Sequence, residues 1–337
     1  MVTIKEVART AGVSVATVSR VYNGHRCVRE ETRQRVRRTA QRLGYSPHGA
    51  AQSLVTKRTH TLGVLLPDLY GEFFSELIRG IDQTAQARGY HVLLSSARSA
   101  ARELEPMLRS MRGRVDGLIV MAPELDAASS RRSLPAGFPF VHLNGPPSDA
   151  PCASLGIANF GGALSMVRHL AALGHRRIAV IRGADYNYDA AERLRGYRHA
   201  VADLGLAAEP RLELPGDFSE ASGYEAVRRL LAAGTRPTAV FAANDCMAFG
   251  ALSALREAGL RVPTDVAVAG FDDIPMARYV HPALTSVHVD IAELGRRATE
   301  RLLDALHEPA GRVATRETIA TTLVVRQSCG AQFGAGH

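Results

Sequence analysis

Residues 3–24 read TIKEVARTAGVSVATVSRVYNG, and this stretch carries the start and end signals of two short helices. Thr3 is suited to cap the first helix, because a glutamate follows three residues later as its capping-box partner. Gly12 comes next, where a tight turn needs a permissive backbone. Ser14 is suited to cap a second helix over about residues 15–22. The stretch therefore predicts two helices joined by a short turn.

A third helix is predicted over about residues 30–43, which carry five arginines. Two helices joined by a short glycine-containing turn, with a third as support, make a helix-turn-helix. Residues 1–60 hold 12 Lys and Arg against 3 Asp and Glu, which leaves 29 basic and 30 acidic residues in the remainder. A basic lobe on a nearly neutral body is typical of a nucleic-acid binder.

The quoted stretch and its continuation over 28–54, VREETRQRVRRTAQRLGYSPHGAAQSL, resemble the DNA-binding motif of the lactose-repressor (LacI/GalR) family. The resemblance implies that the second helix lies in the major groove, with Val15, Ala16 and Arg20 at base-reading positions. Arg20 could bind guanine through O6 and N7, whereas the other two offer only apolar contact. Positions matching phosphate-contacting or capping residues are Thr3, Ser14, Thr17, Ser19, Asn23 and Thr32. For Ser14, capping and DNA contact stay open alternatives.

Residues 47–55, PHGAAQSLV, match the hinge helix of the same family. Pro47 suits a helix start. Leu54 aligns with the leucine that such repressors insert into a minor-groove step, where it kinks the duplex. A nine-residue helix that contains Gly49 is marginal by itself, so we expect it to fold on DNA and unfold away from it.

From residue 61, apolar strands alternate with amphipathic helices, a pattern that predicts parallel sheets with helices on both faces. The whole of 61–328 resembles the periplasmic-binding-protein-like core of the family. The expected fold is an all-α helix-turn-helix domain followed by an α/β core of two doubly wound parallel-sheet subdomains. We expect the DNA-binding domain over 1–46, a hinge helix and linker over 47–60, and a ligand-binding and dimerisation core over 61–337. Within the core we expect an N-subdomain of about 61–160 plus 291–321 and a C-subdomain of about 161–290 plus 322–330.

Polar residues follow the carboxyl ends of several predicted strands, namely Asp68, Asn144, Asn244, Asp245, Asp272 and Asp273. Ligands of open α/β sheets bind at that edge. Amides and carboxylates together with an arginine suit an uncharged, polyhydroxylated ligand. We therefore expect a small sugar or sugar derivative in a cleft between two sheets, which would close by a hinge.

The resemblance implies particular ligand contacts. Arg193 matches the arginine that clamps the ligand, since its planar fork can bind two adjacent hydroxyls. Asp189 lies one helical turn earlier. The other matching positions are the aromatic residues Phe73, Phe74 and Phe218 and the hydroxyl-binding residues Asn244 and Asp272. For Phe73 and Phe74, packing in the core is an equal alternative. The sequence departs from the family at Gly156-Ile157, where an Asp-Asn pair is usual, and this departure puts a ligand contact there in doubt.

The leading hypothesis is a homodimeric repressor that binds a palindromic operator and controls genes of carbohydrate uptake or catabolism. The alternatives are a purine- or nucleoside-responsive repressor and, more remotely, a sugar-binding transport protein. An enzyme is not expected, because no GxGxxG after a strand, P-loop, HExxH or GxSxG motif is present. The four dispersed cysteines and the charged N-terminus indicate a cytoplasmic protein with no structural metal, no cofactor and no membrane segment.

Overall fold

The computed structural model describes residues 2–22, 27–45, 58–97, 106–107, 109–111, 113–150, 152–307 and 315–331. The chain divides into two compact units. The first is Met1–Thr61 with Arg112–Asp116, and the second is Leu62–Met111 with Gly117–His337. The hinge helix predicted over 47–55 lies outside the described residues.

The N-terminal unit contains the three predicted helices, α1 (Ile4–Ala11), α2 (Val15–Tyr22) and α3 (Glu30–Leu43). The capping box at the start of α1 is present, because Glu6 N donates to the Thr3 hydroxyl and Thr3 N donates to the Glu6 carboxylate. Gly12 ends α1 with a left-handed φ of 65°, which a residue without Cβ adopts without strain. Apolar side chains from all three helices form the core of this unit: Val7, Ala8, Ala11, Val18, Val21, Val36 and Ala40.

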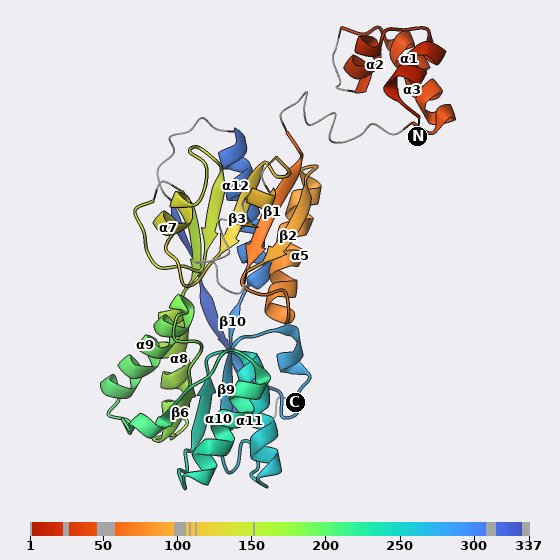
Figure 1. Ribbon diagram of the computed structural model, residues 1–337. Helices are drawn as coiled ribbons and strands as arrows, with labels where there is room; N and C mark the ends of the chain where they lie inside the picture. Colours follow the sequence, from red (N-terminus) through yellow and green to blue (C-terminus); the bar gives the residue numbers. More distant parts are fainter. Residues whose placement is uncertain are drawn as a thin grey trace. The chain divides into compact units, whose positions relative to one another are not determined.

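The second unit holds two six-stranded sheets (Figure 1). The first sheet has the order β11-β5-β4-β3-β1-β2, and its pairs from β11 to β1 are parallel. Its strands are β1 (Thr61–Leu66), β2 (His91–Ser96), β3 (Gly117–Met121), β4 (Phe140–Leu143), β5 (Ala153–Ile157) and β11 (Arg316–Ile319). The helices of this N-subdomain are α5 (Glu72–Ala87), α7 (Ala127–Arg132) and α12 (Ile291–His307).

The second sheet has the order β12-β10-β9-β8-β6-β7 and is parallel except at its edge, where β12 runs antiparallel to β10. Its strands are β6 (Ile178–Ile181), β7 (Glu213–Leu214), β8 (Ala239–Ala242), β9 (Ala267–Asp272), β10 (Thr285–Val289) and β12 (Thr321–Val324). The helices of this C-subdomain are α8 (Asn159–Ala172), α9 (Tyr188–Asp203), α10 (Glu220–Ala232) and α11 (Asp245–Glu257). Three short 3₁₀ turns are η1 (Pro210–Leu212), η2 (Pro275–Arg278) and η3 (Gln327–Cys329).

Strand β6 shows how one sheet forms two cores. Ile178 and Val180 belong to the cluster that includes α8 and α9, whereas Ala179 and Ile181 belong to the cluster that includes α10 and α11. Successive side chains of a strand point to opposite faces of the sheet. The strand is therefore apolar throughout, and the C-subdomain is doubly wound with a helix pair on each face (Figure 1).

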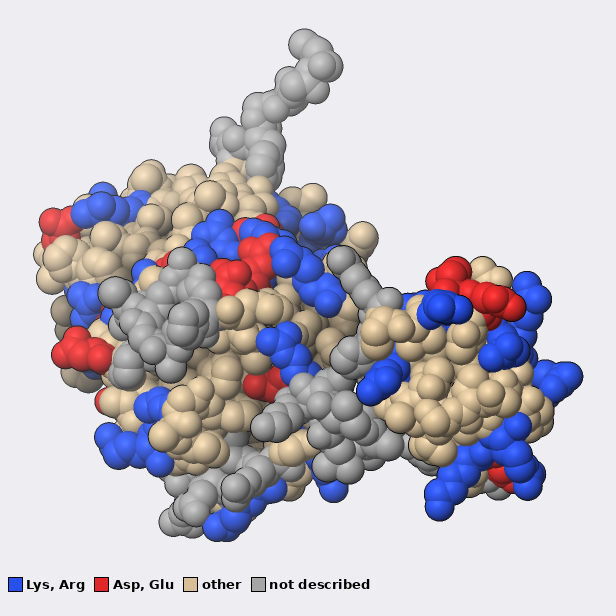
Figure 2. Space-filling view, turned by 90° about the horizontal axis from the view of Figure 1, so that it is seen from above, with Lys and Arg blue, Asp and Glu red and all other residues tan. Residues whose placement is uncertain are grey.

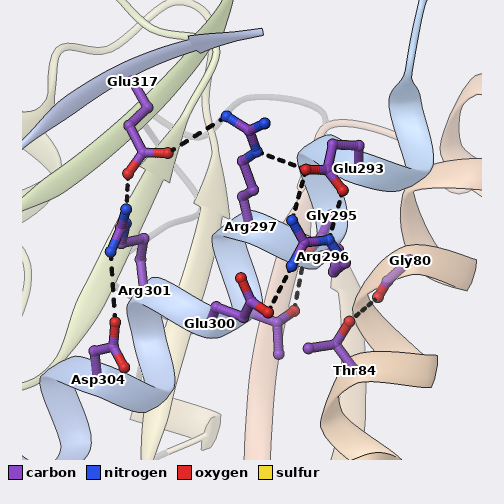
Figure 3. A network of polar contacts seen from close by, with 11 residues as sticks. Gly80, Thr84, Glu293, Gly295, Arg296, Arg297, Glu300, Arg301, Asp304 and Glu317 are labelled. Atoms are coloured by element: carbon purple, nitrogen blue, oxygen red, sulfur yellow. Dashed lines mark hydrogen bonds and ion pairs between the residues drawn. The ribbon is translucent and has the colours of Figure 1, made fainter.

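Helices α5 and α12 approach each other closely at two glycines, Gly80 and Gly295 (Figure 3). A Cβ at Gly80 would lie 2.0 Å from the carbonyl oxygen of Ala292, and one at Gly295 would lie 2.4 Å from that of Leu77. Figure 3 also shows arginine–carboxylate pairs along α12 that reach Glu317 of β11. These pairs lie within α12 or join it to β11, and exposed pairs of this kind contribute at most about 1 kcal/mol each.

The chain passes between the two sheets three times: after β5, after β10 and after β11. Two hydrogen bonds also join the subdomains at their junction. Met276 N of η2 donates to Glu72 of α5 at 2.8 Å, and Tyr188 N of α9 donates to the Pro123 carbonyl at 3.0 Å. The ends of β4, β5 and β9 and the first turns of α8 and α9 therefore lie where the two subdomains meet.

Candidate DNA interface and effector site

The outer face of α2 carries the three predicted base-reading residues. Val15 is 41% exposed, and Ala16 and Arg20 are exposed as well. Val18 and Val21 of the same helix are buried against α1 and α3. The helix thus presents one arginine and two apolar side chains outward, as entry into a major groove requires.

The predicted phosphate-contacting hydroxyls also have structural tasks. The Ser14 hydroxyl accepts a hydrogen bond from Thr17 N at 3.1 Å and lies 2.9 Å from the Thr17 hydroxyl, so it caps α2. Thr3 caps α1 in the same way. Ser19 and Thr32 are half-buried at the surface of the unit. In both caps the hydroxyl oxygen accepts the hydrogen bond, whereas a phosphate contact would need the hydroxyl to donate its O–H, and DNA contact by these residues stays a prediction.

Two other predicted DNA contacts, Asn23 and Leu54, lie outside the described residues. Lys and Arg side chains are prominent on the surface of the N-terminal unit (Figure 2). This distribution agrees with the excess of basic residues before residue 61. The unit therefore has the electrostatic character that phosphate binding requires.

Arg193 of α9 is the centre of the candidate effector site, although it is only 4% exposed. Its Nε donates to Asn159 Oδ1 at 2.8 Å, and its Nη1 donates to the Ala243 carbonyl at the end of β8. Its Nη2 lies 3.0 Å from Asp272 Oδ1, and its guanidinium carbon lies 3.8 Å above the centre of the Phe271 ring. A guanidinium has five N–H donors, so these three contacts leave two N–H groups for another acceptor.

Asn159 connects Arg193 to the third predicted polar residue. Its Oδ1 accepts from Arg193, and its Nδ2 donates to Asp189 Oδ1 at 2.8 Å. The structure therefore brings Asp189, Arg193 and Asp272 into one buried polar network. Sequence reasoning missed Asn159 because it looked for a contact at Gly156-Ile157. The signal lies two residues further on, in an asparagine at the start of the helix that contains Gly161-Gly162.

Burial changes the acidity of the carboxyls in this network. It raises the pKa of Asp272 from its ordinary 3.8 to about 6, against the opposing effect of Arg193. It raises the pKa of Asp189 to about 7, again against Arg193. Asp245 is buried beside them, with its Oδ2 accepting from Ile274 N, and burial raises its pKa well above the ordinary value. Carboxyls with raised pKa values in a buried cluster are typical of functional sites.

Backbone strain marks the same junction. Asn144 follows β4 with a φ of 51°, and Phe218, Asp272 and Asp273 have φ values of 74°, 104° and 54°. Non-glycine residues in this region cost on the order of 1–3 kcal/mol each and gather at functional sites. The strain therefore gives separate support to a site at the carboxyl ends of the strands.

Asn244 and Phe218 lie next to each other on the C-subdomain side. Asn244 caps α11 by accepting from Met247 N at 2.9 Å, and its Nδ2 donates to the Phe218 carbonyl at 3.0 Å. The Phe218 ring packs over Gly183, where a Cβ would lie 2.3 Å from it. Asn244 thus holds the loop that carries Phe218, and ligand contact by either residue stays a prediction.

Phe73 and Phe74 form an edge-to-face pair in the first turn of α5, with ring centres 5.5 Å apart. Both are half-buried and pack against the main hydrophobic core. The structure thus gives them the packing role that the sequence left open, and a ligand contact would use only their exposed edges.

A hollow of about 190 Å³ opens beside the Arg193 network, between the two subdomains. Asn144, Asn159, Asp189 and Gly156 are among the residues that line it. Asn144 is 1% exposed, and neither atom of its amide has a hydrogen-bond partner among the described residues. A buried amide without a partner is costly, so this hollow suits a ligand that both donates and accepts hydrogen bonds.

Both parts of the chain resemble known proteins. Residues 3–48 match the model of "Bacterial regulatory proteins, lacI family", and residues 167–329 match that of a periplasmic binding protein-like domain. The chain is 38% identical to the HTH-type transcriptional repressor PurR of Erwinia tasmaniensis, with 97% of each chain covered. It is 37% identical to the ribose operon repressor of Escherichia coli K12, over 92% of this chain and 94% of that one.

Solved structures show the same architecture. The lac repressor dimer bound to operator and the anti-inducer ONPF superposes with a TM-score of 0.87 at 31% identity, covering 98% of this chain and 99% of that one. A LacI family regulator from Enterococcus faecium with bound ribose superposes at 0.72 and 30% identity, covering 80% of this chain and 98% of that one.

The protein is therefore a bacterial regulatory protein with a helix-turn-helix and an α/β sensing core. It belongs to the lacI family. This result confirms the predicted family and fold class, and it assigns the chain to transcriptional regulators rather than to enzymes. None of the helices in the described part of the chain combines the length and apolar character that spanning a membrane requires.

Proposed function

We propose that the protein is a dimeric, cytoplasmic repressor of carbohydrate genes whose affinity for a palindromic operator is set by a small sugar. The outer face of α2 reads the operator, with Arg20 as the residue that discriminates between bases. The sugar binds at the junction of the two subdomains, around Arg193.

One observation carries the choice of a sugar. The hollow beside the Arg193 network is lined by Asn144, whose buried amide lacks any described partner, and by Asn159 and Asp189, which belong to that network. Hydroxyl groups both donate and accept hydrogen bonds, so a polyhydroxylated ligand in the hollow satisfies both atoms of the Asn144 amide. A planar arginine fork suits two adjacent hydroxyls.

The relatives support this choice and also define its rival. One relative is a ribose operon repressor, and similar structures contain ribose or cellobiose. Another relative is named PurR. A purine would stack on an aromatic face. Phe73, Phe74 and Phe218 are half-buried aromatic residues at the positions that the sequence indicated, and Phe160 and Tyr188 line the hollow itself. A purine-responsive repressor is therefore the second candidate.

The ligand changes operator affinity only if it binds one arrangement of the subdomains better than another. The bond from Met276 N to Glu72 and the bond from Tyr188 N to the Pro123 carbonyl both cross the junction. A ligand that draws the subdomains together changes these contacts, and with them the part of the chain that leads to the DNA-binding unit.

A thermal-shift titration of the full-length protein with ribose, cellobiose and adenine tests the choice. A ligand that binds the folded state raises the melting temperature as its concentration rises. We expect a sugar to raise it and adenine to leave it unchanged. Stabilisation by adenine alone would contradict a sugar effector and indicate a purine effector instead.

A further inference from the structure

Helix α3 carries a row of arginines that the proposed function does not use. Arg35, Arg38 and Arg42 are all exposed, and none of them forms an ion pair with a described residue. They line a shallow groove of about 370 Å³ on the helix surface together with Glu31, Gln34 and Thr39, so the groove holds three arginines and one glutamate. We call Arg35, Arg38 and Arg42 the α3 arginine row.

The row points away from the core of the N-terminal unit. Val36 and Ala40 of α3 are wholly buried and form the face that packs on α1 and α2. Residues at i, i+3 and i+7 share one face of a helix, and at 100° per residue Arg35, Arg38 and Arg42 lie roughly opposite Val36 and Ala40. The α3 arginine row therefore forms the outer surface of α3.

This surface and the base-reading face of α2 lie on different sides of the unit. Val18 and Val21 of α2 are buried against the same core that holds Val36 of α3. The outer face of α2, which carries Arg20, is therefore directed away from α3, and the row is directed away from α2. A duplex that is bound to α2 and also contacts Thr32, in the first turn of α3, leaves the later turns with Arg38 and Arg42 uncovered.

We propose that the α3 arginine row binds the sugar-phosphate backbone of a second DNA duplex while α2 holds the operator. The helix rises 1.5 Å per residue, so the row extends about 10 Å from Arg35 to Arg42. Successive phosphates of one strand are about 3.4 Å apart along the duplex axis, so the row can neutralise about three of them. Such contact depends on charge and carries no sequence information.

The charge distribution favours DNA, rather than the ligand-binding core of this protein, as the partner of the α3 arginine row. Residues 1–60 carry a net charge of +9, whereas the rest of the chain is nearly neutral at −1, from 29 basic and 30 acidic residues. α3 itself holds five arginines and two glutamates. A dimer carries two such rows, so a repressor bound to its operator can hold another segment of DNA and move between segments.

The test uses full-length protein bound to an immobilised palindromic duplex that has been selected from a random pool. A fluorescent duplex of unrelated sequence is then added at increasing salt concentration. In the variant Arg35→Gln/Arg38→Gln/Arg42→Gln we expect capture of the second duplex to fall at least about tenfold and its log–log salt slope to fall by about 3. Glutamine is a good helix former, and circular dichroism checks that α3 is intact.

Two matched variants separate local contact from overall charge. Arg168→Gln/Arg211→Gln/Arg256→Gln removes three exposed arginines from the surface of the ligand-binding core. We expect this variant to capture the second duplex normally. Arg35→Lys/Arg38→Lys/Arg42→Lys keeps the charge, so we expect it to retain capture.

Four results would overturn the proposal. The first is normal capture of the second duplex by the glutamine variant, and the second is an equal loss in the core variant. The third is a proportionate loss of the glutamine variant's affinity for the immobilised palindrome, which would place the row against the operator. Displacement of the second duplex by polyglutamate as readily as by DNA would assign the row to acidic proteins and would likewise contradict a DNA site. Failure to select any palindrome would refute the proposed function, and capture of random duplexes would still be measurable.

Discussion

Arg193 on α9 and Asp272 at the end of β9 form an ion pair across the C-subdomain, with Nη2 and Oδ1 3.0 Å apart. Their side chains are only 4% and 7% exposed. Removing one partner of a buried pair leaves the other charge uncompensated, which costs about 3–5 kcal/mol. The pair is therefore a structural element as well as part of the candidate effector site, and we expect it to be sensitive to substitution.

Replacing Arg193 by alanine should remove the effector response and lower the free energy of unfolding by about 3–5 kcal/mol. Arg193 is the group that holds the pKa of Asp272 down against burial, so that pKa should rise further in the variant. Urea unfolding and a ligand thermal-shift titration measure the two effects. Arg195→Ala, an exposed arginine of the same helix paired with Glu192, is the control and should respond normally. A normal response of Arg193→Ala would mean that the effector binds elsewhere.

Asp189→Asn should change how stability depends on pH. The pKa of Asp189 is about 7 in the folded protein against an ordinary 3.8, so over this range the folded state holds a proton that the unfolded state has released. This carboxyl therefore makes stability fall as pH rises through that window, with each unit of pKa difference worth about 1.4 kcal/mol. The variant lacks this loss, so its stability relative to the wild type should increase with pH.

Urea titrations at several pH values between about 4 and 8 check this prediction. Asp203→Asn removes a carboxyl from the exposed surface of the same helix and serves as the control. A constant difference between Asp189→Asn and the wild type over the whole range would show that Asp189 titrates normally.

Gly80→Ala should destabilise the N-subdomain, because its Cβ would lie 2.0 Å from the Ala292 carbonyl oxygen of α12. The helices must then move apart, and overpacking of this kind costs about 1–3 kcal/mol. Gly156→Ala is the matched control, since a Cβ there meets nothing within 4 Å. Thermal unfolding of the two variants compares them, and equal stability would show that α5 and α12 do not depend on the close approach.

Arg20→Ala should weaken operator binding by about 1–3 kcal/mol while leaving affinity for random duplexes nearly unchanged. The physical reason is that its exposed guanidinium is the group on the outer face of α2 that can form two hydrogen bonds with a guanine. Competition binding with selected and random duplexes measures the ratio. Arg9→Ala removes the same charge from α1 and should leave that ratio unchanged. An equal loss by Arg20→Ala on all DNA would assign Arg20 to phosphate contact.

Local signals made the N-terminal unit predictable, because its caps lie within a few residues of the groups they satisfy. Thr3 and Gly12 delimit α1 as expected, and Ser14 caps α2. The alternation of strands and helices likewise predicted two sheets. The short strands β5, β7, β10, β11 and β12 were not among the predicted strands, since two to five residues carry too little periodicity.

The effector site was less predictable because its contacts depend on tertiary structure. Arg193 and Asp272 could be chosen from the family resemblance, and the structure places them in contact. Asn159 was missed, since its role depends on α8 and α9 packing side by side. The unpartnered amide of Asn144 could not be inferred from sequence, because burial without a hydrogen-bond partner is a property of the folded chain.

The central claim is that a sugar held around Arg193 alters the affinity of α2 for its operator. The direct measurement is a fluorescence-anisotropy titration of the full-length protein with a selected palindrome, with and without the sugar that gives the largest thermal shift. We expect a change of about fivefold or more in operator affinity, and by linkage the same factor in sugar affinity when the operator is bound. A sugar that binds equally well with and without the operator would contradict it.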